Sequence, residues 1–521
     1  MKEFRLLLTI FQAACLFSTR SQAVPTKAKD GKTQPSSSIN TTSGRYIGSP
    51  SKTHPDVLEY IGIRYALPPV KDLRFAPPVA FVSNQVFNAS TQPPDCPYVV
   101  HNWGAVPGEL YSHAGRIMSE ESADAYNIMS EDCLYLNLWT KSSGNSKKKP
   151  VLVFVYGGGF ERGSVNNPTY NGVYFAEQED LVVVSFNYRV NIFGFSGAPG
   201  AGTNLALRDC RLALEWVRDN IEAFGGDPTR ITMFGQSQGA WIISWYAYAF
   251  PNDPIAQAFI QESGSAFADL SSTEEERAAI WRNASASIGC DQASDPVRLE
   301  CMRNQSVSTV LGAMLSIPQQ GVAPTFGPLI DEELVFSNYT ARTLSRDFAQ
   351  KPFLMGSNDN EAGFYVMRYA GNNQITLSAT QQETISYGEF VCPIAADAAV
   401  KRAIASESVP VWRYEYFGNW PNLRLYPGSG AYHTSEVSMV FGTSADLTGE
   451  PNTPLQEIVS RYMRHAWATF ARDPMNGLRE QLGWPVYNNT GDTLVRLGYG
   501  NETKASFVSP AEYDAPCSAL V

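Results

Sequence analysis

The chain alternates short, continuously apolar runs with segments of helical periodicity. Residues 150–156 and 181–188 are two such runs, rich in β-branched and aromatic side chains. Because a half-exposed strand would alternate polar and apolar positions, these runs predict strands that are covered on both faces. A third run, residues 231–234, leads directly into a glycine-rich turn.

Between the second and third runs, apolar side chains recur at intervals of three and four residues, which predicts a helix over residues 206–224. The stripe consists of Leu207, Cys210, Leu214, Val217, Ile221 and Phe224. Glycines 225 and 226 are expected to end this helix, and Asp227-Pro228 to turn the chain. Residues 240–245 predict the next helix. This alternation indicates an α/β fold, with a large, mostly parallel central sheet covered by helices on both faces.

The N-terminus has the features of a secretory signal. Lys2 and Arg5 precede an apolar run that is too short to span a bilayer, and small residues follow where a signal peptidase cleaves. We predict a signal peptide over residues 1–23, a flexible polar arm over 24–44 and a single domain over 45–521. No later stretch of the sequence is apolar enough to be a transmembrane segment, so a secreted protein is expected.

Charge disfavours one class of function, nucleic-acid binding, and the cysteine content bears on disulfides and metal sites. The formal net charge is −11, and an acidic surface repels phosphate backbones, which disfavours nucleic-acid binding. Cys15 lies in the predicted signal and seven cysteines remain, so at least one should be free. An oxidising compartment favours disulfides over metal ligation. Candidate glycosylation sequons begin at Asn40, Asn88, Asn283, Asn304, Asn338, Asn488 and Asn501.

The turn after the third run reads Gly235-Gln236-Ser237-Gln238-Gly239. A Gly-x-Ser-x-Gly sequence between a strand and a helix forces a sharp bend that lifts the serine hydroxyl above the sheet edge. The motif alone is weak, because a glycine-rich turn without chemistry has the same pattern. Its position between a strand and a helix favours Ser237 as a nucleophile.

A serine nucleophile also needs oxyanion donors and a base. Residues 157–159 are three glycines directly after the first strand, where backbone N–H groups could reach a substrate oxygen. Among the five histidines, only His433 and His465 follow the serine, as this chain order requires. His465 lies in a strongly helical segment, whereas His433 follows a glycine-rich loop. We therefore favour His433.

Several collinear segments together resemble the type-B carboxylesterase/lipase family of α/β-hydrolases, which includes cholinesterases and secreted fungal carboxylesterases and lipases. The segments are residues 62–69, 73–75, 130–137, 157–160, 224–228 and 234–240. The resemblance covers nearly all of the chain after the predicted signal. It implies a carboxylic-ester hydrolase.

The resemblance also implies roles for individual residues. Ser237 would be the nucleophile, His433 the general base and acid, and Glu361 the acid that orients the histidine. Asp359 is a nearby alternative for this acid, but the residue spacing of the family selects Glu361. The backbone N–H groups of Gly158, Gly159 and Gln238 would form the oxyanion hole. Ser263 and Glu436 match a pair that supports the histidine from behind, although both could be ordinary loop residues.

The cysteines and two ion pairs also match the family pattern. It implies the disulfides Cys96–Cys133, Cys290–Cys301 and, with a weaker match, Cys392–Cys517. Cys210, on the helical stripe, would then be a buried free thiol. Arg74–Glu131 and Arg189–Asp209 match structural ion pairs of the family.

Some positions depart from the family pattern. Gln236 replaces the usual glutamate before the nucleophile, which lowers the attraction for cationic substrates, and Gln238 replaces the usual alanine after it. The stretch between Glu361 and His433 is short. The tryptophan with which cholinesterases bind choline has no counterpart shortly before Cys133. These departures disfavour a cholinesterase.

We therefore expect a secreted hydrolase that cleaves an uncharged, small-molecule ester through an acyl-enzyme, without a metal or an organic cofactor. A triacylglycerol lipase is an alternative, with the loop between Cys96 and Cys133 as a lid at a lipid interface. Hydrolysis of a natural-product ester or lactone is a further alternative. A non-catalytic adhesion protein is disfavoured because Ser237 and His433 are both present. The sequence leaves the specific ester and the oligomeric state open.

Overall fold

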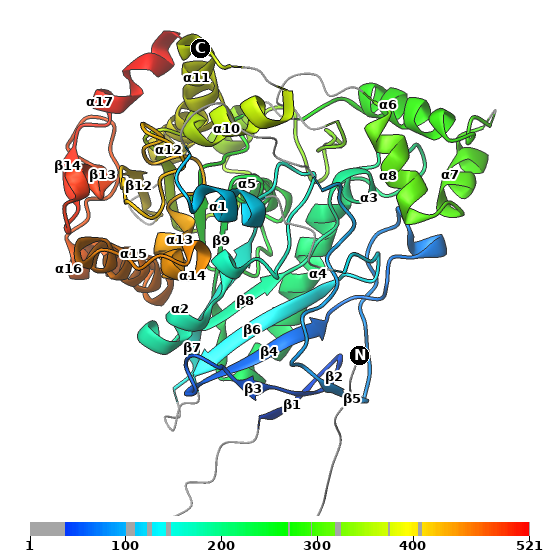
Figure 1. Ribbon diagram of the computed structural model, residues 1–521, viewed down its shortest axis with the longest axis horizontal. Helices are drawn as coiled ribbons and strands as arrows, with labels where there is room; N and C mark the ends of the chain where they lie inside the picture. The colour runs from blue at the N-terminus through cyan, green and yellow to red at the C-terminus, as the bar shows by residue number, and fades with distance from the viewer. Residues whose placement is uncertain are drawn as a thin grey trace, which may run out of the picture. The chain divides into compact units, whose positions relative to one another are not determined.

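Eleven strands, counted over the described residues, form the central sheet of the fold (Figure 1). The computed structural model describes residues 37–100, 110–121, 128–141, 147–268, 271–292, 294–317, 325–373, 376–404 and 409–519. In sheet order the strands are β14 (Ser506–Val508), β13 (Leu494–Leu497), β12 (Val411–Tyr416), β11 (Phe353–Asn358), β10 (Ala258–Glu262), β9 (Gly226–Gln236), β7 (Lys149–Val155), β8 (Val182–Phe186), β6 (Tyr135–Lys141), β4 (Val57–Arg64) and β3 (Ser49–Pro50).

The middle of this sheet is parallel and its two edges are antiparallel. The strands from β8 through β7, β9, β10, β11 and β12 to β13 pair in parallel. Antiparallel pairs join β8 to β6, β6 to β4, β4 to β3 and β13 to β14. The mostly parallel α/β sheet expected from the apolar runs is therefore confirmed.

The predicted strands appear with small shifts in their ends. Every residue of β7 and β8 is buried, as expected for continuous apolar strands. The strand expected at residues 231–234 is longer, because β9 already begins at Gly226. Asp227 and Pro228, which were expected to turn the chain, lie in this first part of β9, where the register with β7 shifts.

Helices pack against both faces of the sheet (Figure 1). Helices α4 (Leu205–Asn220) and α5 (Gln238–Ala249) pack against each other and against β9. Helices α2 (Val173–Glu179) and α15 (Pro454–Arg472) form a second packed pair, with α2 against β8 and α15 against β7. The stripe predicted on α4 and on the short helical turn that follows it is buried throughout.

The remaining α-helices lie in the connections between strands, except the last, which follows β14. They are α1 (Ala114–Glu121), α3 (Asn191–Gly194), α6 (Glu274–Ser287), α7 (Asp295–Arg303), α8 (Val307–Leu315), α9 (Tyr339–Leu344), α10 (Ala362–Asn373), α11 (Ala379–Glu383), α12 (Cys392–Ile404), α13 (Val437–Phe441), α14 (Ser444–Thr448), α16 (Gly477–Leu482) and α17 (Ala511–Asp514). A π-helical segment, η4 (Thr384–Val391), joins α11 to α12. The short stretch between Glu361 and His433 thus consists largely of helix.

The predicted signal peptide lies outside the described residues, as does most of the predicted arm. The arm was expected to reach residue 44, but ordered pairing begins earlier. Strand β1 (Ser38–Thr41) pairs antiparallel with β2 (Gly44–Ile47), and β2 pairs with β5 (Val86–Asn88). Ile39 packs against the main core, which gives this segment an apolar anchor that its polar composition had obscured.

Three disulfides join Cys96 to Cys133, Cys290 to Cys301 and Cys392 to Cys517, the pairs that the family resemblance implies. Cys210 is the free cysteine of the described residues, and burial raises the pKa of its thiol, which keeps it unreactive.

The two ion pairs implied by the resemblance are also formed, with 2.5 Å between Arg74 and Glu131 and 2.6 Å between Arg189 and Asp209. In the described part of the chain, none of the helices combines the length and the apolar character needed to cross a membrane.

Candidate active site

Ser237 occupies a sharp turn between β9 and α5. Its backbone has φ 56° and ψ −126°, a conformation that is strained for a residue with a side chain. The turn fits only because glycines lie beside it: a Cβ on Gly239 would be 1.9 Å from the Val155 carbonyl oxygen, and one on Gly264 would be 2.7 Å from the Ser237 oxygen. The glycines of the Gly-x-Ser-x-Gly motif therefore allow α5 to pack closely against β7.

A carboxylate and an imidazole meet next to this turn. Glu361 follows directly after β11, and His433 lies in the loop after β12, so both come from ends of neighbouring parallel strands. His433 Nδ1 donates to Glu361 Oε2 over 2.6 Å, and both side chains are buried. A carboxylate that accepts from Nδ1 leaves the imidazole Nε2 as the proton acceptor.

Two neighbouring groups donate hydrogen bonds to the other carboxylate oxygen of Glu361. Ser263 Oγ donates to Glu361 Oε1 over 2.6 Å, and the backbone N–H of Asn358 donates to the same oxygen over 2.7 Å. Ser263 thus acts on His433 only through Glu361. Glu436 is hydrogen-bonded to the side chain of Asn358 and not to His433.

Buried carboxyl groups lie behind the histidine. Burial raises the pKa of Glu262 to about 8, although Trp467 Nε1 donates to it over 2.6 Å. Burial also raises the pKa of Glu436 well above its usual value, and the charges of Glu262 and Glu361 raise it further. Glu361 is the member of this group that is hydrogen-bonded to the histidine, while the burial of Glu436 favours its protonated form.

Aromatic rings and one glutamine surround the imidazole. The His433 ring centre lies 4.5 Å from that of Phe390 and 5.6 Å from that of Tyr365. Gln236 Nε2 donates to His433 Nε2 over 3.2 Å. Among the described residues, no hydrogen bond joins Ser237 Oγ to His433. The amide of Gln236 therefore occupies the nitrogen that a serine nucleophile would need.

The glycine loop lies opposite the turn. Gly158 and Gly159 have φ values of 128° and 68°, and a Cβ on Gly158 would be 2.2 Å from the Arg162 carbonyl oxygen. The side chain of Gln238 accepts from the backbone N–H of Phe160 through Oε1 over 2.5 Å. Gln238 thus ties the loop to the first turn of α5, a contact that the sequence did not predict.

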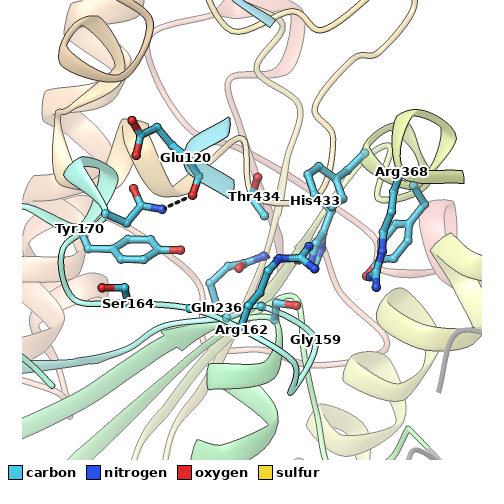
Figure 2. Close-up of a pocket in the computed structure, with 16 residues that line it drawn as sticks. Glu120, Gly159, Arg162, Ser164, Tyr170, Gln236, Arg368, His433 and Thr434 are labelled. Atoms are coloured by element: carbon cyan, nitrogen blue, oxygen red, sulfur yellow. Dashed lines mark hydrogen bonds between the residues drawn. The ribbon is translucent and has the colours of Figure 1, made fainter. Parts of the chain in front are cut away.

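The glycine loop, Gln236, Ser237 and His433 line one pocket, shown in Figure 2. Its lining consists of Glu120, Gly157, Gly158, Gly159, Arg162, Gly163, Ser164, Asn167, Tyr170, Gln236, Ser237, Phe364, Tyr365, Arg368, His433 and Thr434. None of these residues, within the described part of the chain, has an aliphatic side chain. The described part of the lining is polar and aromatic.

Two arginines in this lining were not predicted from the sequence. Arg368 lies on α10, one turn after Phe364 and Tyr365, so its helical spacing could have indicated a position on the same face. Arg162 follows the glycine loop, and its exposed fraction is only 3%. No motif marked it, because its place depends on how the loop folds back.

Other predicted residues lie away from the pocket or outside the description. His465 is on α15, as its helical pattern predicted, where it contacts Glu179, and the described lining of the pocket does not include it. Asp359 has no hydrogen bond to His433 among the described residues. The predicted lid, between Cys96 and Cys133, lies partly outside the description, since residues 101–109 and 122–127 are not described. Six sequon asparagines are exposed and Asn501 is half-buried; glycosylation remains a prediction.

Comparison with known proteins shows the family of this chain. The model of the carboxylesterase family matches residues 35–388 and 364–515. A chlorogenic acid esterase of Aspergillus niger is 33% identical over 484 residues, which cover 89% of this chain and 91% of the relative. Secreted lipase 5 of Gibberella zeae is 31% identical over 505 residues, covering 92% and 93%.

An acetylcholinesterase of Electrophorus electricus is 33% identical over 556 residues, covering 89% of this chain and 85% of the relative. The family match spans most of the chain, and the mostly parallel sheet with helices on both faces has the architecture of the α/β-hydrolases. The chain therefore belongs to the carboxylesterase family, and it is a serine hydrolase of carboxylic esters with the α/β-hydrolase fold.

Proposed function

We propose that Ser237, His433 and Glu361 are the catalytic triad of this esterase. The observation that carries the proposal is the 2.6 Å hydrogen bond between His433 and Glu361, next to a serine on a strained strand–helix turn in the same pocket. The amide of Gln236 must leave His433 Nε2 before the serine can use it. Catalytic hydrogen bonds are often loose in the free enzyme and tighten when substrate binds.

The reaction then follows two half-cycles. His433 Nε2 takes the proton of Ser237 as Oγ bonds to the ester carbonyl carbon, and the oxyanion accepts hydrogen bonds from the backbone N–H groups of Gly158, Gly159 and Gln238. The bond to the alcohol breaks, and the alcohol leaves with the proton from His433. Water then attacks the acyl-serine in the same way and releases the acid. Glu361 stabilises the imidazolium in both halves.

We also propose that the enzyme is secreted. Residues 1–23 resemble a signal peptide, the structure contains three disulfides, and one relative is named a secreted lipase. Disulfides persist mainly in oxidising compartments, which fits an extracellular enzyme.

The pocket favours small polar or aromatic esters over triacylglycerols. Tyr170, Phe364 and Tyr365 offer aromatic surface, while no aliphatic side chain is among the described lining residues. A relative that acts on chlorogenic acid is consistent with this preference. A tailoring hydrolase for a natural-product ester would use the same pocket.

Labelling with a fluorophosphonate tests the proposed nucleophile. The wild-type protein should gain one adduct per chain on the tryptic peptide that contains Ser237, with parallel loss of activity on a small aryl ester. The Ser237→Ala variant should gain none. An adduct on another residue, or full activity in the labelled protein, would contradict the proposal.

A further inference from the structure

A guanidinium group borders the glycine loop of the pocket. Arg368 lines the same cavity as Ser237 and His433 (Figure 2). If Gly159 carried a side chain, its Cβ would lie 3.7 Å from Arg368 Nη1. The guanidinium therefore lies close to a backbone N–H that we propose as an oxyanion donor.

Glu161 holds this arginine from one side. Arg368 Nη2 donates to Glu161 Oε2 over 3.1 Å, and the two side chains are only 18% and 15% exposed. In the described part of the chain, Arg368 has no other hydrogen-bond acceptor. Its Nε and Nη1 therefore retain N–H groups that a ligand in the pocket could use.

The charged groups around Arg368 still allow an anion to bind. Arg162 also lines the pocket, 4.0 Å from Glu161, so two guanidinium groups share this carboxylate. Figure 2 shows the Glu120 carboxylate on the side of the cavity away from Arg368. Glu389 adds only a partial charge, because burial raises its pKa to about 7.

The residue before the proposed nucleophile also favours an anionic substrate. Gln236 is neutral, and it lines the pocket beside His433. A carboxylate at this position would repel an anionic substrate. The absence of a carboxylate at this position and the presence of Arg368 both lower the electrostatic cost of binding a negatively charged group.

We propose that Arg368 forms an anion subsite, and that the preferred substrates are esters that carry a carboxylate near the scissile bond. The inference rests on the proposed function of Ser237, and it replaces the uncharged ester expected from the sequence. A guanidinium suits a carboxylate because its parallel N–H groups match the two oxygens. Partial burial strengthens this pairing relative to an exposed ion pair.

Two matched substrate pairs test the subsite. One pair carries the carboxylate on the acyl side: 4-nitrophenyl hydrogen glutarate and 4-nitrophenyl methyl glutarate. The other pair carries it on the alcohol side: 3-acetoxybenzoate and methyl 3-acetoxybenzoate. Release of the phenol is followed after subtraction of the uncatalysed rate. The wild-type enzyme should have the higher kcat/KM for the carboxylate in at least one pair.

Arg368→Gln should lower kcat/KM for that carboxylate substrate about 10- to 100-fold, the usual range for a hydrogen bond to a charged group. Its kcat/KM for the matched methyl ester should fall less, so that the ratio within the pair drops, and its melting temperature shows whether the variant is folded. Arg218→Gln is the control: it removes the same charge from an exposed position on α4, and the ratio within each pair should not change.

Two results would overturn the subsite: a wild-type preference for the methyl ester in both pairs, or an unchanged carboxylate preference in Arg368→Gln. If that variant failed to fold, a salt titration of the wild-type enzyme would decide. The carboxylate preference should fall as ionic strength rises, and a constant preference would refute the subsite. Failure of the wild-type enzyme to hydrolyse any of the four esters would instead contradict the proposed function.

Discussion

At the residue scale, two glutamines distinguish this site. Gln236 donates to the nitrogen of His433 that accepts the serine proton in the proposed mechanism, so the proposed base is hydrogen-bonded to an amide in the free enzyme. Gln238 contributes its backbone N–H to the proposed oxyanion hole and also fixes the opposite wall, through its bond to Phe160. Preorganised donors are effective because they need no reorganisation during the reaction.

Replacing Gln238 by methionine tests the second role. Gln238→Met keeps the side-chain length and the backbone N–H but loses the acceptor for Phe160 N–H. We expect kcat/KM to fall about fivefold, equally for neutral and carboxylate esters, since one hydrogen bond contributes about 1 kcal/mol. The matched control is Gln261→Met, because the buried Gln261 side chain has no hydrogen-bond partner among the residues that the structure describes. An unchanged kcat/KM in Gln238→Met would refute the role.

At the element scale, the close approach of α5 to β7 positions the nucleophile. Local sequence sufficed to predict this unit, because apolar runs, helical stripes and glycine turns act over a few residues. The side chain of Gln238 was not predicted as a tether, since its partner Phe160 lies 78 positions away in the sequence. Arg368 was missed for a similar reason: only folding brings α10 next to the glycine loop.

Gly239→Ala tests the packing at this turn. The added Cβ would lie 1.9 Å from the Val155 carbonyl oxygen, so the strand and the helix must separate. We expect a loss of at least about 3 kcal/mol in the free energy of unfolding, together with loss of activity. Gly312→Ala on α8 is the control, because a Cβ added there would have no atom within 4 Å. It should be neutral, or stabilise the helix by up to about 1 kcal/mol; equal melting temperatures for the two variants would contradict this account.

At the scale of the whole molecule, several acidic side chains are buried without full compensation. Burial raises the pKa of Glu262 and of Glu415 to about 8 and that of Glu389 to about 7. In the unfolded chain these groups ionise near 4.5, so between pH 4.5 and 8 the folded protein binds more protons than the unfolded chain. Their contribution to stability is full below pH 4.5 and is lost as the pH rises toward 8.

Glu415→Gln should therefore flatten the pH dependence of stability. Glu415 is 4% exposed, and its Oε2 has no hydrogen-bond partner. We expect the free energy of unfolding of the wild-type protein to fall between pH 5.5 and 8, and that of the variant to fall less, by a difference on the order of a few kcal/mol. Melting temperatures measured across this pH range check the expectation. Glu480→Gln, at an exposed position on α16, should keep the wild-type slope. Identical slopes for Glu415→Gln and the wild-type protein would refute the assignment.

The central claim is that Ser237 is the nucleophile of a carboxylic-ester hydrolase. Its most direct test is the kcat of Ser237→Ala on a small aryl ester, measured beside the melting temperature of the same protein. We predict a melting temperature close to that of the wild-type protein and a fall in kcat of about 10⁴-fold or more, as for removal of a serine nucleophile elsewhere. Undiminished turnover by the folded variant would contradict the account.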